Sequence, residues 1–252
     1  MTLDDRQAAL CDAAPADYGD LRAVSVNCTL KAEPDASHTG RLMSAAEAIM
    51  ERVGVAVDRI HLASHPVAFG VQPDMTEHGA ARDAWPELWA RIREADVLLV
   101  GTPIWLGEES SVCRLLIERL YGMSGLLNDK GQSVFYGRTA GAVITGNEDG
   151  VKHCAMTILY ALQHLGYAIP PQADCGWIGE AGPGPSYGDP TEDGPAGFDN
   201  DFTQRNLTIM TWNLLHMARM LRDAGGLPRH GNDREAWKAG CRFDFENPEH
   251  RA

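Results

Sequence analysis

The chain has few cysteines, and none of the six lies in a C-x-x-C pair. Zinc sites and cysteine-ligated iron–sulfur clusters depend on closely spaced cysteines, so neither is indicated. A chain of 252 residues can bury a core without disulfides, and scattered cysteines then indicate reduced thiols. The acidic first 20 residues contain no long apolar stretch, which argues against a signal peptide. We therefore expect a cytoplasmic protein.

Long apolar runs and excess positive charge are also missing. Nowhere do about 18 apolar residues follow one another, so we expect no membrane-spanning helix. Lys and Arg number 22 against 35 Asp and Glu, a formal net charge of −13. This balance argues against nucleic acid and an anionic membrane surface as partners. A small anionic ligand stays compatible with it, because backbone N–H groups at a helix N-terminus act locally.

Several ligand-binding motifs are missing too. The sequence contains neither the phosphate loop G-x-x-x-x-G-K-[ST] nor the dinucleotide fingerprint G-x-G-x-x-G. His61 and His65 have i,i+4 spacing but lack a Glu partner, so surface or packing roles are favoured and no metal site is expected. Cys28 precedes a helix, where a thiol is either small filler or activated by the helix N-terminus.

Apolar residues alternate between continuous strand-like runs and helical spacing. The pattern predicts strands at residues 21–26, 55–62, 96–102, 140–145 (with further strand-like residues at 133–136) and 168–175. It predicts helices at 37–53, from about 86 to 95, 112–120, 151–165 and 203–222. The segment 96–102 contains a continuous apolar run at 97–100, which is typical of a strand covered on both faces.

Alternation of five strands with five helices predicts an α/β fold with a parallel sheet. We expect a three-layer sandwich whose five strands have the flavodoxin-like order 2-1-3-4-5, rather than a six-stranded dinucleotide fold. The predicted domain covers residues 21–223 and includes an inserted Gly/Pro-rich loop at 176–200. It is preceded by an acidic leader, 1–20, and followed by a tail, 224–252, that carries Phe243 and Phe245.

In this fold, ligands bind at the carboxyl ends of the strands, near the switch point of the strand order. Three loops begin there, at Asn27, Thr102 and Thr145. The first supplies hydroxyls that can donate to a phosphate at a helix N-terminus. Ser37 in this loop is also a credible N-cap, so an ordinary capped helix explains the same residues.

The second loop contains Pro103 and Trp105, and the third contains Gly146 and Gly150. A rigid turn with an aromatic side chain can hold a flat ligand, and glycines let the backbone approach it closely. Each loop also has an alternative explanation. Trp105 could simply close the core at a strand end, and the third loop could be an exposed turn.

Together the three loops resemble those of the flavodoxin-like NADPH-dependent FMN reductases. Thr29-Leu30-Lys31 stands where that family usually has Ser-Pro-Arg, and Ser37-His38-Thr39 stands where it usually has Gly-Asn-Thr. Residues 101–107 are similar to the family segment Gly-Ser-Pro-aromatic-Tyr-Trp-Gly, in which backbone amides contact the flavin ring. Residues 145–150 resemble the third flavin-contacting loop.

The resemblance implies an FMN site made of Thr29, Lys31, Ser37, His38, Thr39, Thr102, Pro103, Ile104, Trp105, Leu106, Gly107, Thr145, Gly146, Asn147 and Gly150. It implies NADPH or NADH as electron donor, and a quinone, a flavin or a similar small molecule as acceptor. It also implies a homodimer or homotetramer. No catalytic residue is assigned, because hydride transfer to a flavin needs no dedicated protein acid.

Two other functions fit the same resemblance. One is a flavodoxin-type electron carrier with no reaction of its own with a nicotinamide, which the net charge of −13 suits. The other is a structural module that keeps the fold without flavin, which the altered first loop allows. The aromatic, glycine-rich insertion around Trp177 and Tyr187 is either a lid over the flavin or a contact between subunits.

Overall fold

The structure is built on a parallel sheet. It is a computed structural model that describes residues 3–182 and 184–241. The main strands are β1 (Arg22–Asn27), β2 (Ala56–His61), β3 (Val97–Trp105), β5 (Thr139–Gly146) and β6 (Asp174–Ile178). They lie in the order β2-β1-β3-β5-β6, and every pairing among them is parallel. The expected flavodoxin-like order is confirmed, with a short antiparallel strand β4 (Glu108–Glu109) added beside β3.

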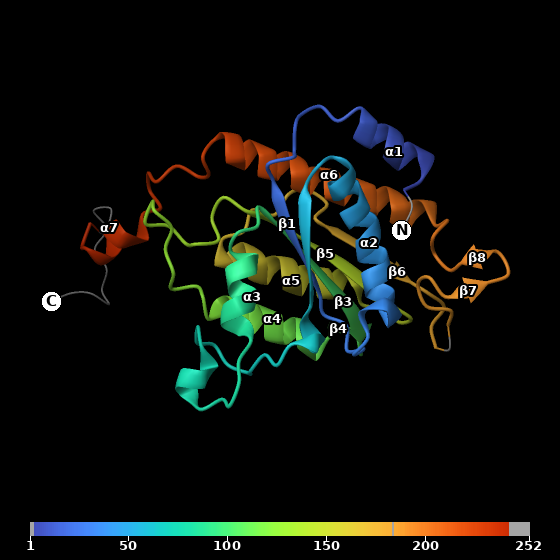
Figure 1. The fold of residues 1–252 in the computed structure, drawn as a ribbon, viewed down its shortest axis with the longest axis horizontal. Coiled ribbons are helices and arrows are strands. Elements are labelled where there is room, and N and C mark those ends of the chain that lie inside the picture. The colour runs from blue at the N-terminus through green and yellow to red at the C-terminus, as the bar shows by residue number, and fades with distance from the viewer. Residues whose placement is uncertain (1–2, 183, 242–252) are drawn as a thin grey trace.

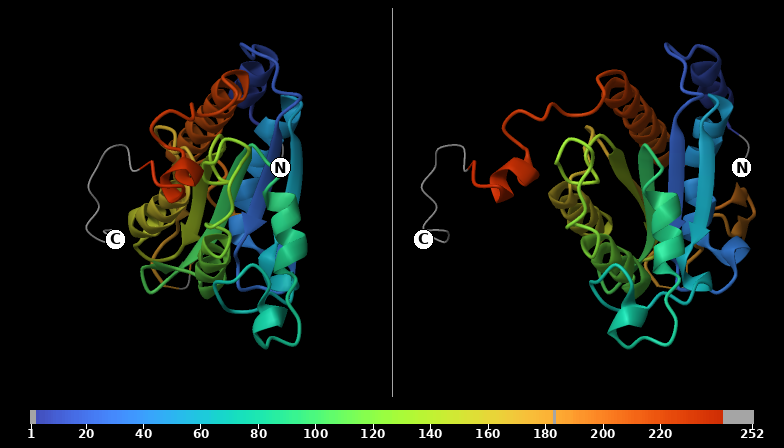
Figure 2. Two further views of the ribbon diagram at one scale, coloured as in Figure 1. Left: turned by 90° about the vertical axis from the view of Figure 1, so that its left-hand side faces the viewer. Right: turned by 60° about the vertical axis from the view of Figure 1, so that its left-hand side comes forward.

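Helices cover both faces of the sheet, which confirms the three-layer sandwich (Figures 1 and 2). One face packs against α2 (His38–Arg52) and α6 (Asp201–Asp223), and α1 (Asp5–Asp12) lies against these two helices. The other packs against α3 (Trp85–Ile92), α4 (Ser111–Tyr121) and α5 (Val151–Leu165). Along β3, Val97 and Leu99 enter the first core while Leu98 and Val100 enter the second. A strand buried on both faces is apolar along its covered length, as β3 is from Val97 to Val100.

The structure differs from the predicted secondary structure in three places. The acidic leader contains helix α1, whose capping box joins Asp4 and Gln7, and Gln7 Nε2 donates to Thr208 Oγ1 at 3.0 Å. Residues 133–136 form no strand; Ser133 makes an isolated bridge with Leu127, and a turn follows it. The last strand begins at Asp174, since residue 168 makes only a single bridge.

Short elements complete the described chain. Single turns of 3-10 helix occur at η1 (Pro34–Ala36), η2 (Leu62–Ser64) and η3 (Met75–His78). The insertion carries a small hairpin of β7 (Pro190–Thr191) and β8 (Gly194–Pro195), and α7 (Arg234–Lys238) follows α6. The tail residues Phe243 and Phe245 lie outside the described residues. No described helix has the length and apolar character needed to cross a membrane.

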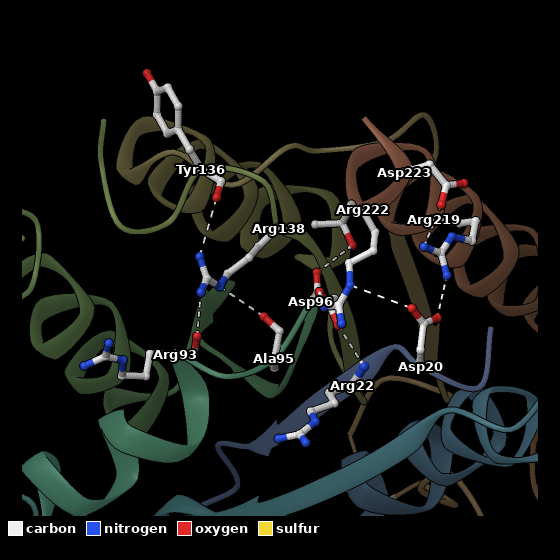
Figure 3. Close-up of polar contacts among 11 residues, drawn as sticks. Asp20, Arg22, Arg93, Ala95, Asp96, Tyr136, Arg138, Arg219, Arg222 and Asp223 are labelled. Atoms are coloured by element: carbon white, nitrogen blue, oxygen red, sulfur yellow. Dashed lines mark hydrogen bonds and ion pairs between the residues drawn. The ribbon is translucent and has the colours of Figure 1, made fainter. Parts of the chain in front are cut away.

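Ion pairs and backbone contacts fill the amino-terminal edge of the sheet (Figure 3). Asp96 accepts from the backbone N–H of Arg22 at 2.9 Å and from Arg222 at 2.8 Å, which ties the end of α6 to β1. Arg138 donates to the carbonyl oxygens of Arg93 and Ala95 at 2.6 and 3.1 Å. Structural contacts therefore occupy the amino-terminal edge of the sheet, so we expect a ligand site at the edge where the strands end.

Candidate functional site

A cavity of about 560 Å³ lies where β1, β3 and β5 end. Its volume falls within the ~300–1,000 Å³ that is usual for small-molecule sites. Residues after β1 that line it are Thr29, Leu30, Lys31, His38 and Thr39. Those at the ends of β3 and β5 are Pro103, Ile104, Trp105, Thr145, Gly146, Asn147 and Glu148. Three strand ends thus share one cavity.

Hydrogen bonds fasten these three regions to one another. Thr39 Oγ1 and Thr145 Oγ1 lie 2.7 Å apart and are buried, which joins the start of α2 to the end of β5. The backbone N–H of Cys28 donates to the Gly101 carbonyl at 2.8 Å, and Ser110 Oγ donates to the Cys28 carbonyl at 2.6 Å. The cavity is therefore held by contacts between distant segments and does not depend on one flexible loop.

Positive charge gathers at the end of the cavity next to α2. Lys31 and His38 line it, and Arg41 follows one turn along the helix. The first turn of a helix also carries N–H groups without intrahelical acceptors. Lys31 Nζ donates to the Ala36 carbonyl at 2.7 Å, and burial lowers the pKa of Lys31 from its ordinary value. This combination of a helix N-terminus, amine and hydroxyls suits a phosphate group.

The first loop owes its shape to Asn27. Its side chain donates to Ser37 Oγ at 3.0 Å and accepts from the Thr29 N–H at 3.1 Å. Ser37 Oγ in turn accepts from the Gly40 N–H at 2.9 Å, so it is the N-cap of α2. Ser37 does not line the cavity. The capped helix and the ligand loop are therefore compatible, with Ser37 serving the cap.

The second region is a strand and not the turn expected from Pro103. β3 continues to Trp105, and the chain reverses at Leu106 and Gly107, both at positive φ (53° and 80°). The Leu106 N–H donates to Glu148 Oε1 at 3.0 Å, which holds this turn against the third loop. The Trp105 side chain is 55% exposed and lines the cavity, which excludes the alternative of a core-closing tryptophan.

Glycines allow the third loop to lie close to the second. A Cβ on Gly146 would stand 3.0 Å from the Ile104 side chain. Gly150 has a φ of 141°, and a Cβ there would stand 2.8 Å from the Gly107 carbonyl oxygen. Gly146 lines the cavity, whereas Gly150 packs against the turn of the second region.

The insertion after β6 supplies a fourth wall that the resemblance did not place. We call residues 179–182 and 184–189 the strap. Its cavity-lining residues are Gly182, Ser186 and Tyr187. Tyr187 is fully buried between Trp177 and Phe198, with ring centroids 5.5 and 5.1 Å away. Of the two roles considered for the insertion, the lid is the one that this position fits.

The cavity therefore contains most, but not all, of the residues inferred from the resemblance. Those that do not line it are Ser37, Thr102, Leu106, Gly107 and Gly150. Thr102 is buried and accepts from the Ser110 N–H at 3.0 Å, while Leu106 is 93% exposed on the outside of its turn. The residues missed were Leu30, Glu148, Gly182, Ser186 and Tyr187. Leu30 and Glu148 stand inside the loops that resemble the family, and Tyr187 lies in the insertion considered as a lid, but none of the three was assigned to the FMN site.

Other reactive groups near the site have structural explanations. Cys28 is fully buried and burial raises the pKa of its thiol, so of the two explanations the structure favours small filler. Residues 184–188 read G-P-S-Y-G and match the hydrolase pattern G-x-S-x-G, which requires a strand–turn–helix elbow. Here they form a loop, and Ser186 Oγ donates to Asn147 Oδ1 at 2.9 Å.

Histidines play packing roles where the sequence raised the question of a metal. His61 Nε2 donates to the Lys31 carbonyl at 2.9 Å, at the base of the first loop. Across residues 3–182 and 184–241, no three His, Cys, Asp or Glu side chains are grouped to hold a metal ion.

Sequence comparison gives two relatives. The chain is 57% identical over 221 residues to the divalent metal cation transporter MntH of Mycobacterium bovis. That match covers 88% of this chain but 31% of the transporter, so the chain spans less than a third of that protein's length. It is 34% identical over 208 residues to 8-demethyl-8-aminoriboflavin-5′-phosphate synthase of Streptomyces davaonensis, covering 81% of this chain and 79% of the synthase.

Structure comparison gives a similar result. RosB with the bound intermediate 8-demethyl-8-formylriboflavin-5′-phosphate aligns with a TM-score of 0.77 and 33% identity, over 90% of this chain and 88% of RosB. The NAD(P)H:acceptor oxidoreductase FerB of Paracoccus denitrificans aligns with a TM-score of 0.51 and 16% identity, over 82% of this chain and all of FerB, which shows a shared fold.

The family assignment follows from the sequence profile. Residues 22–176 match the profile described as NADPH-dependent FMN reductase. This segment runs from β1 into β6 and includes every loop at the carboxyl edge except the strap. The chain belongs to the NADPH-dependent FMN reductase family, flavin-dependent oxidoreductases with a flavodoxin-like fold.

Proposed function

We propose that this chain binds FMN in the cavity and uses NADPH or NADH to reduce a small acceptor such as a quinone or a free flavin. The observation that carries the proposal is the single cavity formed by three strand ends, cationic at one end and walled by Pro103, Ile104 and Trp105 at the other. A phosphorylated flavin has the matching form, because its phosphate is anionic and its ring is flat and partly apolar.

The residues at the two ends have different proposed roles. Lys31, His38 and the hydroxyls of Thr29 and Thr39 bind the phosphate, aided by the first turn of α2. Trp105 covers the apolar part of the ring, and Gly146 leaves room for the ring edge. When bound, the flavin supplies the group that accepts a hydride and passes electrons on. The protein orients it and limits the access of water.

A second candidate is that the flavin phosphate is a substrate rather than a cofactor. Its support is the 34% identity to a synthase that makes an aminoriboflavin phosphate, together with the 0.77 TM-score to RosB holding a formylriboflavin phosphate. The same cavity would then hold a flavin whose ring is altered and released. We do not extend metal transport to this chain, because its match covers only 31% of the transporter.

The remaining properties follow from the proposed reaction. NADPH and NADH are cytoplasmic metabolites, and we propose that the protein works in the cytoplasm. We also propose that it forms a homodimer or homotetramer, as implied by its family, and that neither nucleic acid nor a membrane is a partner.

An anaerobic titration of the FMN-loaded protein tests the proposal. We expect NADPH or NADH to bleach the visible flavin absorption rapidly, and a quinone to restore it. A stable semiquinone formed under a chemical reductant, with no response to either nucleotide, would indicate an electron carrier. A released flavin of altered mass would indicate the second candidate. Protein that takes up no FMN would contradict both candidates.

A further inference from the structure

The strap is fastened near the end of β5 by the side chain of Asn147 and by backbone hydrogen bonds, among them one from the Gly179 N–H to the Gly146 carbonyl at 2.9 Å. Asn147 Nδ2 donates to the Pro185 carbonyl at 3.0 Å and lies 3.4 Å from the Glu180 carbonyl. Asn147 Oδ1 accepts from Ser186 Oγ at 2.9 Å. The Asn147 backbone carbonyl also accepts from the Gly182 N–H at 3.3 Å. A primary amide has two N–H donors, so the strap takes up the donor capacity of this side chain.

The strap folds closely around this amide. A Cβ on Gly179 would lie 2.4 Å from the Pro185 carbonyl oxygen and 2.7 Å from Asn147 Nδ2. A Cβ on Gly184 would lie 3.2 Å from the same Nδ2. Glycine at both positions lets the backbone reach the amide, as a close approach requires. The contact therefore depends on the two glycines of the strap as well as on Asn147.

The other end of the strap is fastened to α2 at the cationic end of the cavity. His38 Nδ1 lies 2.9 Å from the Tyr187 carbonyl, and Arg41 Nη1 donates to the Gly188 carbonyl at 2.9 Å. A carbonyl can only accept, so His38 carries its proton on Nδ1. Asp189 lies 3.5 and 3.7 Å from the same two side chains. The strap thus runs from the end of β5 to the start of α2.

We infer that Asn147 is a positioning residue that fastens the strap across the cavity and so slows the exit of the ligand, instead of binding the flavin ring with its side chain. Gly182, Ser186 and Tyr187 form one wall of the cavity from this position. A ligand under the strap leaves when the strap opens locally, and each hydrogen bond that holds the strap lowers the population of the open state. The inference rests on the proposed FMN site.

The first test concerns the fastening alone and uses the protein without added flavin. Glu180 lies in the strap and is exposed, so a glutamyl endopeptidase can report how often the strap opens. We expect Asn147→Ala to be cut after Glu180 about tenfold faster than the unaltered protein, because the strap loses the hydrogen bonds of this side chain and keeps only the backbone ones. The matched control is Asn213→Ala, whose Nδ2 also donates to a proline carbonyl, that of Pro171 at 2.8 Å, away from the strap. It should be cut at the unaltered rate.

The second test measures the rate of FMN release from the loaded protein by the recovery of flavin fluorescence on dilution. Release should be about tenfold faster in Asn147→Ala and unchanged in Asn213→Ala. Faster FMN release with unchanged cleavage after Glu180 would show that Asn147 contacts the flavin directly and would overturn the inference. An unchanged rate of both release and cleavage would overturn it as well. If Asn147→Ala does not fold, Ser186→Ala removes one of the same hydrogen bonds and must show both effects in smaller measure.

These two tests separate the inference from the proposed function. Cleavage after Glu180 is measured without flavin, so it decides whether Asn147 fastens the strap even if FMN does not bind. Failure of the protein to take up FMN would contradict the proposed function and the claim about ligand exit. Normal FMN uptake with a strap that opens equally often in both variants would contradict the inference alone.

Discussion

Asp83→Ala should lower the free energy of unfolding by about 3–5 kcal/mol, measured by urea denaturation. Asp83 and Arg119 form an ion pair at 2.7 Å in which neither side chain is exposed. Asp83 also accepts from the N–H groups of Met75 and Trp85 at 3.0 and 3.1 Å, so it holds the long segment before α3. Its removal leaves the buried Arg119 charge with two carbonyl acceptors and the Trp85 ring but without its carboxylate partner. Burial already lowers the pKa of Arg119 from its ordinary value.

The control for this prediction is an ion pair of similar geometry at the surface. Asp58 and Arg91 lie 2.6 Å apart, with side chains 45% and 37% exposed. Asp58→Ala should cost no more than about 1 kcal/mol, because water solvates the charge left behind. The double variant Asp83→Ala/Arg119→Met should recover part of the lost stability. Equal losses in Asp83→Ala and Asp58→Ala would contradict the role given to the buried pair.

The second large effect concerns the phosphate end of the cavity. Lys31→Ala combined with Thr39→Ala should weaken FMN binding by about 100-fold, because a charged donor and a hydroxyl donor to the phosphate are both lost. Thr39 Oγ1 also holds Thr145 Oγ1 at 2.7 Å, so its loss loosens the junction of two loops. The measurement is the dissociation constant from quenching of flavin fluorescence.

Two controls show whether the loss of FMN affinity comes from lost contacts with the phosphate. Lys130→Ala combined with Thr157→Ala removes an amine and a hydroxyl whose hydrogen bonds lie elsewhere, with Leu227 and His153, and should leave FMN affinity unchanged. Riboflavin lacks the phosphate, so the Lys31 and Thr39 changes can weaken its binding only through the loosened junction of Thr39 with Thr145, and far less than they weaken FMN binding. Equal weakening of FMN and riboflavin would refute the assigned phosphate position.

Local patterns were enough to predict most of the fold. The helix expected at 151–165 is α5, and the strand expected at 96–102, with its apolar run at 97–100, is the first part of β3, which is buried on both faces there. Helix α1 was missed although its signal was present, since Asp4 and Gln7 have the spacing of a capping box. Residues 133–136 were assigned to a strand for their apolar character, but Phe135 enters the core from a turn. Burial alone does not distinguish a strand from a buried turn.

Site residues could be predicted where the strand order determines their position. They could not be predicted where their position depends on contacts between segments far apart in the sequence. The ends of β1, β3 and β5 meet because parallel strands end at the same edge, so Thr39, Trp105 and Thr145 could be placed together. The strap follows no periodic pattern, and its position depends on contacts such as that of Asn147 with Pro185, 38 residues away. Leu106 was misplaced because the sequence does not show that β3 continues through Pro103.

The central claim is that one cavity at the carboxyl edge of the sheet holds a phosphorylated flavin. A crystal structure of the protein with FMN tests it most directly. The account predicts the phosphate within hydrogen-bond distance of Lys31 and Thr39, and the flavin ring against Trp105 beneath the strap. FMN bound at another surface, or turned so that its phosphate lies beside Trp105, would contradict it.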